Sequence, residues 1–224
     1  MFDVFFSPTR AFTRLKARPV WLVPLVLVIG ANMVLALLAA QYVNWQEQRD
    51  RAVERMRERN LSEEQIQQAL EGMERVQTNS ALRYGLPLAG SLITSLVGIF
   101  FIATIYHVSL PLLGAAPSFM RTLAVVTNAG LVAIPAMLVR SALVLIRRSA
   151  EVHTSLLLAA PGLKNGFLAV ILSRIDLFAI WQLLLAGLGL KVMFDMKGTK
   201  SYWLVFSVWG ILTLLFALLG GRIR

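Results

Sequence analysis

Few residues in this chain could do chemistry, and they lie far apart. Asp176 stands at the edge of an apolar stretch, and Arg140 lies inside another. Ionisable groups within membrane-spanning stretches mark ion pathways, proton relays or ligand sites by default, but a relay needs several of them, so we do not expect one here. Asp176 has two structural alternatives, an ion pair with Arg174 or a carboxylate favoured by the dipole at the start of a helix.

Two asparagines, Asn32 and Asn128, also lie within apolar runs. An unpaired amide in lipid is costly, so each amide either bridges packed helices or lines a path for solute. Arg140 lies within two turns of Arg147, so its long side chain can carry the charge to the membrane interface. Structural roles are the simpler interpretation of the intramembrane polar set, which comprises Asn32, Asn128, Arg140 and Asp176.

Recognisable catalytic motifs are absent from the sequence. The two histidines, His107 and His153, lack metal-ligand spacing, and the chain has no cysteine. The patterns HExxH and GxSxG do not occur, nor does a glycine loop of the kind that binds phosphates. We therefore predict no catalytic residues, no cofactor and no metal, and a protein that is not an enzyme.

Composition indicates an integral membrane protein. Of the 224 residues, 57% are hydrophobic and 15% are charged, and the mean hydropathy is +0.68. A soluble domain is nearer half apolar and a quarter charged. The apolar residues gather into runs of about twenty, which match a hydrocarbon core of roughly 30 Å. The net charge of +10 comes from basic residues that flank these runs or alternate with acids, so we expect a lipid bilayer and no nucleic acid as partner.

These patterns predict an all-α fold with five transmembrane helices. Residues 1–19 form a basic amphipathic helix that lies in the headgroup layer. Residues 149–173 hold two apolar pieces that are too short to cross, which predicts short surface helices or a re-entrant pair. We expect the chain to be organised around residues 110–138, where one span turns tightly into the next. The five spans are expected at residues 20–43, 85–113, 119–146, 175–194 and 201–220.

Residues 44–84 predict an extramembrane helical hairpin between the first two spans. Ser62 and Gln65 have the spacing of a capping box, which starts the second arm. An apolar stripe at helical spacing follows it. The stripe either packs against the first arm or offers a face to a partner protein, and it consists of Ile66, Leu70, Met73 and Val76.

Small residues form two candidate helix-packing strips. Gly90, Thr94 and Gly98 repeat every four residues in the second span, and Gly187 and Gly189 lie in the fourth. Apolar burial supplies little drive between helices in lipid, so small side chains promote association by letting backbones approach closely. Both strips therefore predict packing rather than chemistry.

Three segments together resemble the Yip-domain family, whose eukaryotic members interact with Ypt/Rab GTPases. The segment LLGAAPSFMRTLAVVTNAGLVAIPAML resembles the central hairpin of that family. RIDLFAIWQLLLAGLGLKVM resembles its fourth span, with Asp176, Phe178, Trp181 and Gly189 at characteristic points, and FFSPTRAFTRLKARPVWLVPLVL resembles the start of bacterial members. The resemblance implies five spans, a cytoplasmic N-terminus and a role in organising other membrane proteins or lipids. Some bacterial members are associated with ABC-type export systems. Residues 44–84 lie outside the resemblance.

The distribution of basic residues predicts an orientation in a bacterial cytoplasmic (inner) membrane. Four basic residues precede the first span against the single acid Asp3, which favours a cytoplasmic N-terminus and an extracytoplasmic hairpin. Lys191, Lys197 and Lys200 agree with this orientation. Four basic residues that five spans place outside do not agree with it, namely Arg147, Arg148, Lys164 and Arg174.

The sequence leaves two functions open. The first is a non-enzymatic organiser or accessory subunit for other membrane proteins, such as transporter subunits of an ABC-type export system. The second is a small-solute transporter or channel in which Asn32, Asn128 and Arg140 face one cavity. Homo-oligomerisation is compatible with either.

Overall fold

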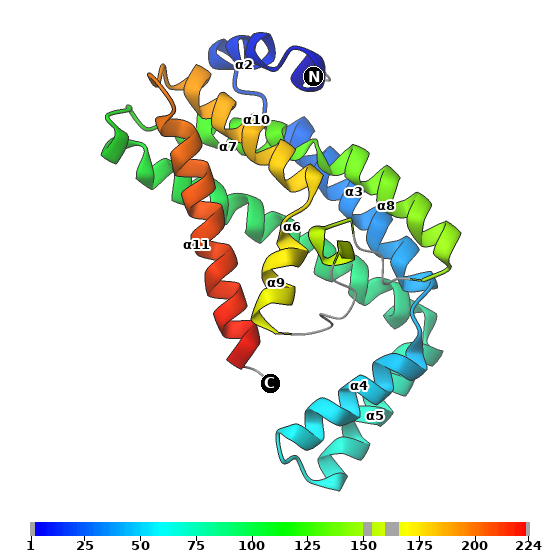
Figure 1. Cartoon of the computed structure of the whole chain (residues 1–224). Coiled ribbons are helices and arrows are strands. Elements are labelled where there is room, and N and C mark those ends of the chain that lie inside the picture. The colour runs from blue at the N-terminus through cyan, green and yellow to red at the C-terminus, as the bar shows by residue number, and fades with distance from the viewer. Residues whose placement is uncertain (1–2, 150–153, 160–165, 223–224) are drawn as a thin grey trace.

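The computed structural model describes residues 3–149, 154–159 and 166–222, and every regular element in these ranges is a helix. The helices form a tilted bundle, with one pair of helices extending from its lower end (Figure 1). The predicted all-α fold is therefore confirmed. Four helical stretches are long and apolar enough to cross a membrane: Leu22–Gln41, Ser80–Leu113, Phe119–Arg147 and Lys200–Leu219.

The fourth predicted span, at residues 175–194, is shorter than the others. It corresponds to α10 (Leu177–Met193), whose 17 residues extend about 25 Å at 1.5 Å per residue, less than a hydrocarbon core of about 30 Å. A short helix, α9 (Phe167–Arg174), precedes α10. Both pack along α11 (Lys200–Arg222). The structure thus shows four candidate spans, and a crossing that includes α10 stays a prediction.

The third predicted span is divided into α7 (Phe119–Gly130) and α8 (Ala133–Arg147). The break has a local cause, because Pro135 cannot donate to the carbonyl four residues back and its ring crowds that carbonyl. The N–H groups of Leu131 and Val132 instead reach back three residues, to the carbonyls of Asn128 and Ala129, at 3.3 Å each. This is one turn of 3₁₀ geometry.

The first part of this divided span, α7, holds the centre of the core. All nine residues from 122 to 130 are buried. The helix packs against α3 (Leu22–Gln41), α6 (Ser80–Ser109), α10 and α2. Before it, the short 3₁₀ turn η1 (Pro111–Leu113) ends at Gly114, whose φ of +79° suits glycine. Within the stretch 110–138, residues 122–132 therefore lie in the interior, whereas its turn is exposed, with Leu112 85% exposed.

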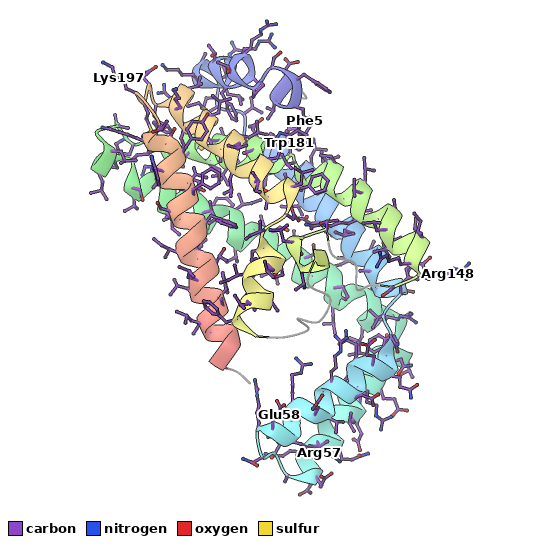
Figure 2. All side chains as sticks on the ribbon, viewed as in Figure 1. Phe5, Arg57, Glu58, Arg148, Trp181 and Lys197 are labelled. Atoms are coloured by element: carbon purple, nitrogen blue, oxygen red, sulfur yellow. The ribbon has the colours of Figure 1, made fainter. Side chains whose placement is uncertain are left out.

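Two short N-terminal helices, α1 (Asp3–Phe6) and α2 (Pro8–Ala17), cover the upper end of α10 (Figure 1). Phe12 of α2 is completely buried. The ring centroids of Phe5 and Trp181 lie 5.4 Å apart, with the ring planes tilted by 57°, and Figure 2 shows the two residues close together. Lys16 Nζ lies 2.5 Å from Asp195 Oδ2, in the turn after α10. The apolar side of this amphipathic segment thus contacts protein, and its position in the headgroup layer stays a prediction.

The polar stretch folds into α4 (Trp45–Glu58) and α5 (Glu63–Thr78), which lie side by side beyond the ends of α3 and α6 (Figure 1). The predicted capping box is confirmed, because Gln65 N donates to Ser62 Oγ at 3.2 Å and Ser62 N donates to Gln65 Oε1 at 3.0 Å. Asn44 caps α4 in the same manner, accepting from Glu47 N. Local sequence rules therefore explain both helix starts.

Part of the segment predicted at residues 149–173 lies outside the described residues, namely 150–153 and 160–165, with His153 and Lys164. The described part contains α9 and a 3₁₀ turn, η2 (Leu156–Ala159). Leu156 N donates to Ile175 O at 2.9 Å, and Ser155 forms a bridge with Asp176. Residues 155–156 therefore lie beside residues 175–176, at the break between α9 and α10.

Candidate functional site

A cavity of about 520 Å³ lies among α3, α6, α7, α8 and the start of α10. Its size falls within the range of small-molecule sites, about 300–1,000 Å³. The lining combines apolar side chains with one group of polar ones. The polar lining residues are Asn32, Thr94, Ser95, Arg140, Arg174, Asp176 and Gln182.

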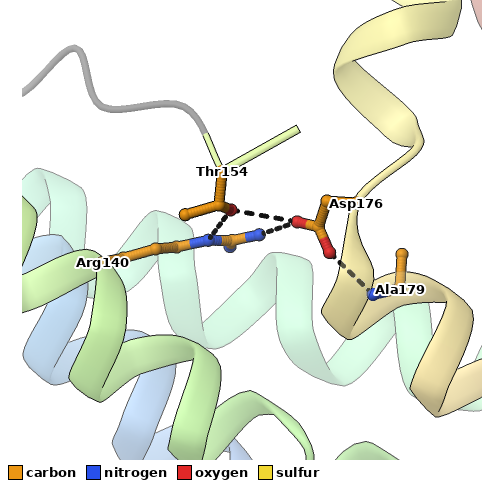
Figure 3. Close-up of polar contacts among 4 residues, drawn as sticks. All are labelled: Arg140, Thr154, Asp176 and Ala179. Carbon is orange, nitrogen blue, oxygen red and sulfur yellow. Dashed lines mark hydrogen bonds and ion pairs between the residues drawn. The ribbon is translucent and has the colours of Figure 1, made fainter. Parts of the chain in front are cut away.

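An ion pair closes one side of this cavity, between α8 and the start of α10 (Figure 3). Arg140 Nη2 lies 2.6 Å from Asp176 Oδ2, and Arg140 Nε donates to Thr154 Oγ1 at 3.2 Å. The Thr154 hydroxyl donates to the same Asp176 oxygen at 3.2 Å. Asp176 is 7% exposed and Arg140 38% exposed, so the carboxylate is buried and the guanidinium reaches the cavity. Removing one member of such a pair leaves the other charge uncompensated, which is strongly destabilising.

Asp176 is also the N-cap of α10. Its Oδ1 accepts from Ala179 N at 2.7 Å, which satisfies an otherwise unpaired N–H at the helix start. Of its two expected roles, the structure shows the helix-start carboxylate, and the ion pair is made with Arg140 instead of Arg174. The Arg174 guanidinium lies 5.1 Å from the ring of Phe216. Arg140 pairs with the buried carboxylate of Asp176, and the expectation that its charge reaches the membrane interface stays a prediction.

The two asparagines lie in different places. Asn32 donates to Ser95 Oγ at 3.1 Å, which joins α3 to α6 beside the cavity. Asn128 is 1% exposed and donates to the carbonyls of Val20 at 2.9 Å and Ala124 at 2.8 Å. Asn128 is therefore absent from the lining, and the arrangement in which Asn32, Asn128 and Arg140 share one cavity is wrong. The amide of Asn128 satisfies backbone carbonyls in the core instead.

Side chains of other helices in this chain occupy the space beside the two glycines of α10. A Cβ built on Gly187 would lie 2.5 Å from the ring of Tyr202. A Cβ on Gly189 would lie 2.8 Å from both Phe12 and Val125. These distances are far shorter than ordinary contacts, so α11, α2 and α7 approach α10 where only glycine fits.

The strip on α6 is open. Gly90, Thr94 and Gly98 are exposed, and a Cβ on either glycine would meet nothing within 4 Å. In the apolar window of Ser80–Leu113 only 6% of residues are buried, against 22–33% for the other three candidate spans. In the part of the chain that the structure describes, no helix approaches the two glycines of the strip closely, so its packing role stays a prediction that needs a second chain.

The apolar stripe of α5 is largely turned inward. Ile66 is 2% exposed, and the other three members are half-buried. Leu70 and Met73 line a groove between α4 and α5. Little of the stripe remains free for another protein, although its use as a partner face is still untested. The members are Ile66, Leu70, Met73 and Val76.

Three polar residues of the site were not expected from the sequence, namely Ser95, Thr154 and Gln182. Gln182 follows Asp176 by six residues, less than two helical turns, in an otherwise apolar helix, so its spacing was a usable signal. Thr154 lies 22 residues before Asp176, and no local pattern connects the two.

The arrangement can bind, and it offers no obvious catalyst. Both oxygens of Asp176 already accept hydrogen bonds, so this carboxylate is not poised as a base. Among the described residues, no three His, Cys, Asp or Glu side chains gather into a possible metal site. The cavity offers a ligand the N–H donors of two arginines, together with amide and hydroxyl groups that both donate and accept.

The long apolar helices and the polar contacts between them define the class, an all-α membrane protein. The family model of the Yip1 domain matches residues 2–219. The chain therefore belongs to the Yip1 domain family, as the three segments suggested. It is 24% identical to membrane protein YknW of Bacillus subtilis (strain 168) over 224 residues, which is 100% of this chain and 90% of that protein. No solved structure matches the chain.

Proposed function

We propose that the protein is a non-enzymatic organiser that binds another membrane protein through α6. The open strip on α6 carries this proposal, because three small residues on one face of an apolar helix favour close helix–helix approach. The two glycines of α10 show what such positions do when they are occupied. Subunits of an ABC-type export system are the first candidates for the partner, and a second copy of the chain is the other.

The test is co-purification from membranes in mild detergent. Gly90→Leu and Gly98→Leu place a branched side chain on the strip, where a Cβ at either position meets no described atom within 4 Å. We expect both variants to fold and to lose the associated membrane protein. Leu92→Ala is the matched control, because Leu92 is exposed on α6 two residues away from the strip and therefore on a different face. Full association of both leucine variants would refute the proposal.

The proposal includes an orientation in a bacterial inner membrane, with α4 and α5 outside and the N-terminus in the cytoplasm. We infer that α9 and α10 together make the crossing predicted at residues 175–194, the fourth in chain order, since both pack along α11. The chain has no cysteine, so single cysteines can be introduced cleanly. An impermeant thiol reagent applied to intact cells should label Ser62→Cys and leave Ser118→Cys and Thr199→Cys unlabelled. Labelling in the reverse pattern would overturn the orientation.

The second candidate is a small-solute transporter, which the cavity favours because it brings Asn32 and Arg140 together. Vesicles that contain the pure protein would then show solute flux, and Asn32→Leu would abolish it. Asn128→Leu is not a suitable variant, because Asn128 lies in the core. Absence of flux across a broad panel of solutes would remove this candidate.

A further inference from the structure

The charged side chains of the cavity gather at the break between α9 and α10. Two guanidinium groups, of Arg140 and Arg174, line it together with the single carboxylate of Asp176. The carboxylate is fully used, since it accepts from Arg140, Thr154 and Ala179. The charged lining therefore has a net positive charge, and Asp176 has little capacity left for a cation.

Arg140 keeps donor capacity on its cavity side. A guanidinium has five N–H donors in a planar fork, and Asp176 and Thr154 engage only Nη2 and Nε. The side chain is 38% exposed. Arg174 lies on an exposed part of α9. Guanidinium groups recognise phosphate in a two-pronged geometry that lysine does not reproduce.

Besides the charged groups, the lining contains four uncharged polar residues and many apolar ones, and the cavity opens on the face of α6. Thr94 and Gly98 line the cavity and are themselves exposed. Because α6 is an apolar candidate span, this opening faces acyl chains rather than water. An anion that enters here is favoured if it carries its own apolar part. The apolar lining includes Val28, Leu35, Ile99, Ile102, Val126 and Met137.

We propose that the cavity binds a phosphate-bearing ligand, the headgroup of an anionic phospholipid, with the phosphate at Arg174 and the outer edge of Arg140. The acyl chains pass Gly98 into the bilayer. The ion pair with Asp176 holds Arg140 in place for this contact, and Asn32 and Ser95 form the polar wall opposite. This site shares Thr94 and Gly98 with the strip proposed to bind a partner, and it differs from the strip in its arginines.

The experiment titrates the purified full-length protein in neutral detergent with phosphatidylglycerol, with phosphatidylcholine and with inorganic phosphate, and detects adducts by native mass spectrometry. Both lipids carry a phosphate, but the choline cation of phosphatidylcholine is repelled by the two guanidinium groups. We therefore expect phosphatidylglycerol, which has no such cation, to bind about tenfold more tightly. Inorganic phosphate should neither stabilise the protein nor displace the lipid at millimolar concentration. If it does both, the site takes free phosphate and the lipid assignment is wrong.

Matched variants separate the site from general attraction to a basic protein. Arg174→Gln removes one guanidinium, and Arg147→Gln is its control at an exposed position outside the cavity. Gly98→Leu blocks the opening, and Gly90→Leu is its control on the same strip but outside the lining. Selective loss in Arg174→Gln and Gly98→Leu supports the site. Equal loss in Arg147→Gln, or unchanged binding in Gly98→Leu, overturns it.

The same variants distinguish this proposal from the proposed function. Gly90→Leu should lose the protein partner and keep the lipid. Arg174→Gln should keep the partner and lose the lipid. Gly98→Leu should lose both, because Gly98 belongs both to the strip and to the lining of the cavity.

Discussion

Two helices carry glycines in apolar surroundings, and they use them differently. On α10, Gly187 and Gly189 receive the rings of Tyr202 and Phe12, and α10 has seven buried residues. On α6, which is 30 residues long, the two residues Ala103 and Tyr106 are buried. Other helices of this chain therefore already pack closely against the glycines of α10, whereas the glycines of α6 remain open to a helix of another protein. The contrast separates glycines that serve folding from glycines that are open to a partner.

The largest loss of stability is expected from removing a side chain that packs against the glycines of α10. Phe12→Ala removes a completely buried ring that packs on Gly189. We expect a loss of about 3–5 kcal/mol in unfolding free energy, the usual cost of truncating a buried phenylalanine. Phe6→Ala is the control, since Phe6 is 88% exposed, and it should change stability by less than about 0.5 kcal/mol. Thermal unfolding in detergent measures both, and equal effects would contradict the docking of α2.

A smaller loss of stability is expected when a methyl group is added to Gly189, the residue on which Phe12 packs. Gly189→Ala places a Cβ 2.8 Å from Phe12 and Val125, and overpacking of this kind costs about 1–3 kcal/mol. Gly98→Ala adds the same methyl group where nothing lies within 4 Å, so stability should be unchanged or slightly higher. The unfolding midpoints of the two variants compare the helices directly. A destabilised Gly98→Ala variant would mean that α6 is not open.

Outside the bundle, Ser62→Ala tests whether the pair α4–α5 is held locally. The substitution removes the hydrogen bond from Gln65 N to Ser62 Oγ, and loss of such a cap costs about 1 kcal/mol. We expect faster amide hydrogen exchange confined to α5, with the exchange of α7 unchanged. Faster exchange throughout α7 would show that the pair and the bundle unfold together.

The smallest effect is expected at the contact between α3 and α6. Asn32→Leu removes the hydrogen bond to Ser95, and hydrogen bonds between membrane helices average about 0.6 kcal/mol. The loss in the unfolding midpoint should therefore be slight. Ser95→Ala should behave alike, and the double variant should lose no more than either single one. Additive losses would show that the two side chains are not coupled.

Local rules predicted the features that depend on neighbouring residues. The capping box at Ser62 follows from its spacing to Gln65. The sequence also identified Gly90 and Gly189 as small-residue positions, but it could not tell which was filled. That difference depends on Phe12, which lies 177 positions from Gly189 along the chain.

The polar site shows the same limit. Arg140 and Asp176 were both recognised as unusual, yet Asp176 was paired with Arg174 as one alternative and Arg140 was expected at the interface. Helical spacing relates only residues within about two turns. Their contact spans 36 positions and requires the break between α9 and α10. Thr154 joins them from a segment whose sequence carries no periodic signal. Long-range packing of charges therefore came from the structure alone.

The most direct test of the central claim is a cysteine cross-linking scan along α6 in intact membranes. Single cysteines would replace Gly90, Leu92, Thr94 and Gly98 in turn, with a short thiol–amine cross-linker. We predict adducts of one defined mass from positions 90, 94 and 98 and none from position 92, with twice the mass of the chain if the partner is a second copy. Equal adducts at all four positions, or an adduct at 92 alone, would contradict a partner-binding strip on α6.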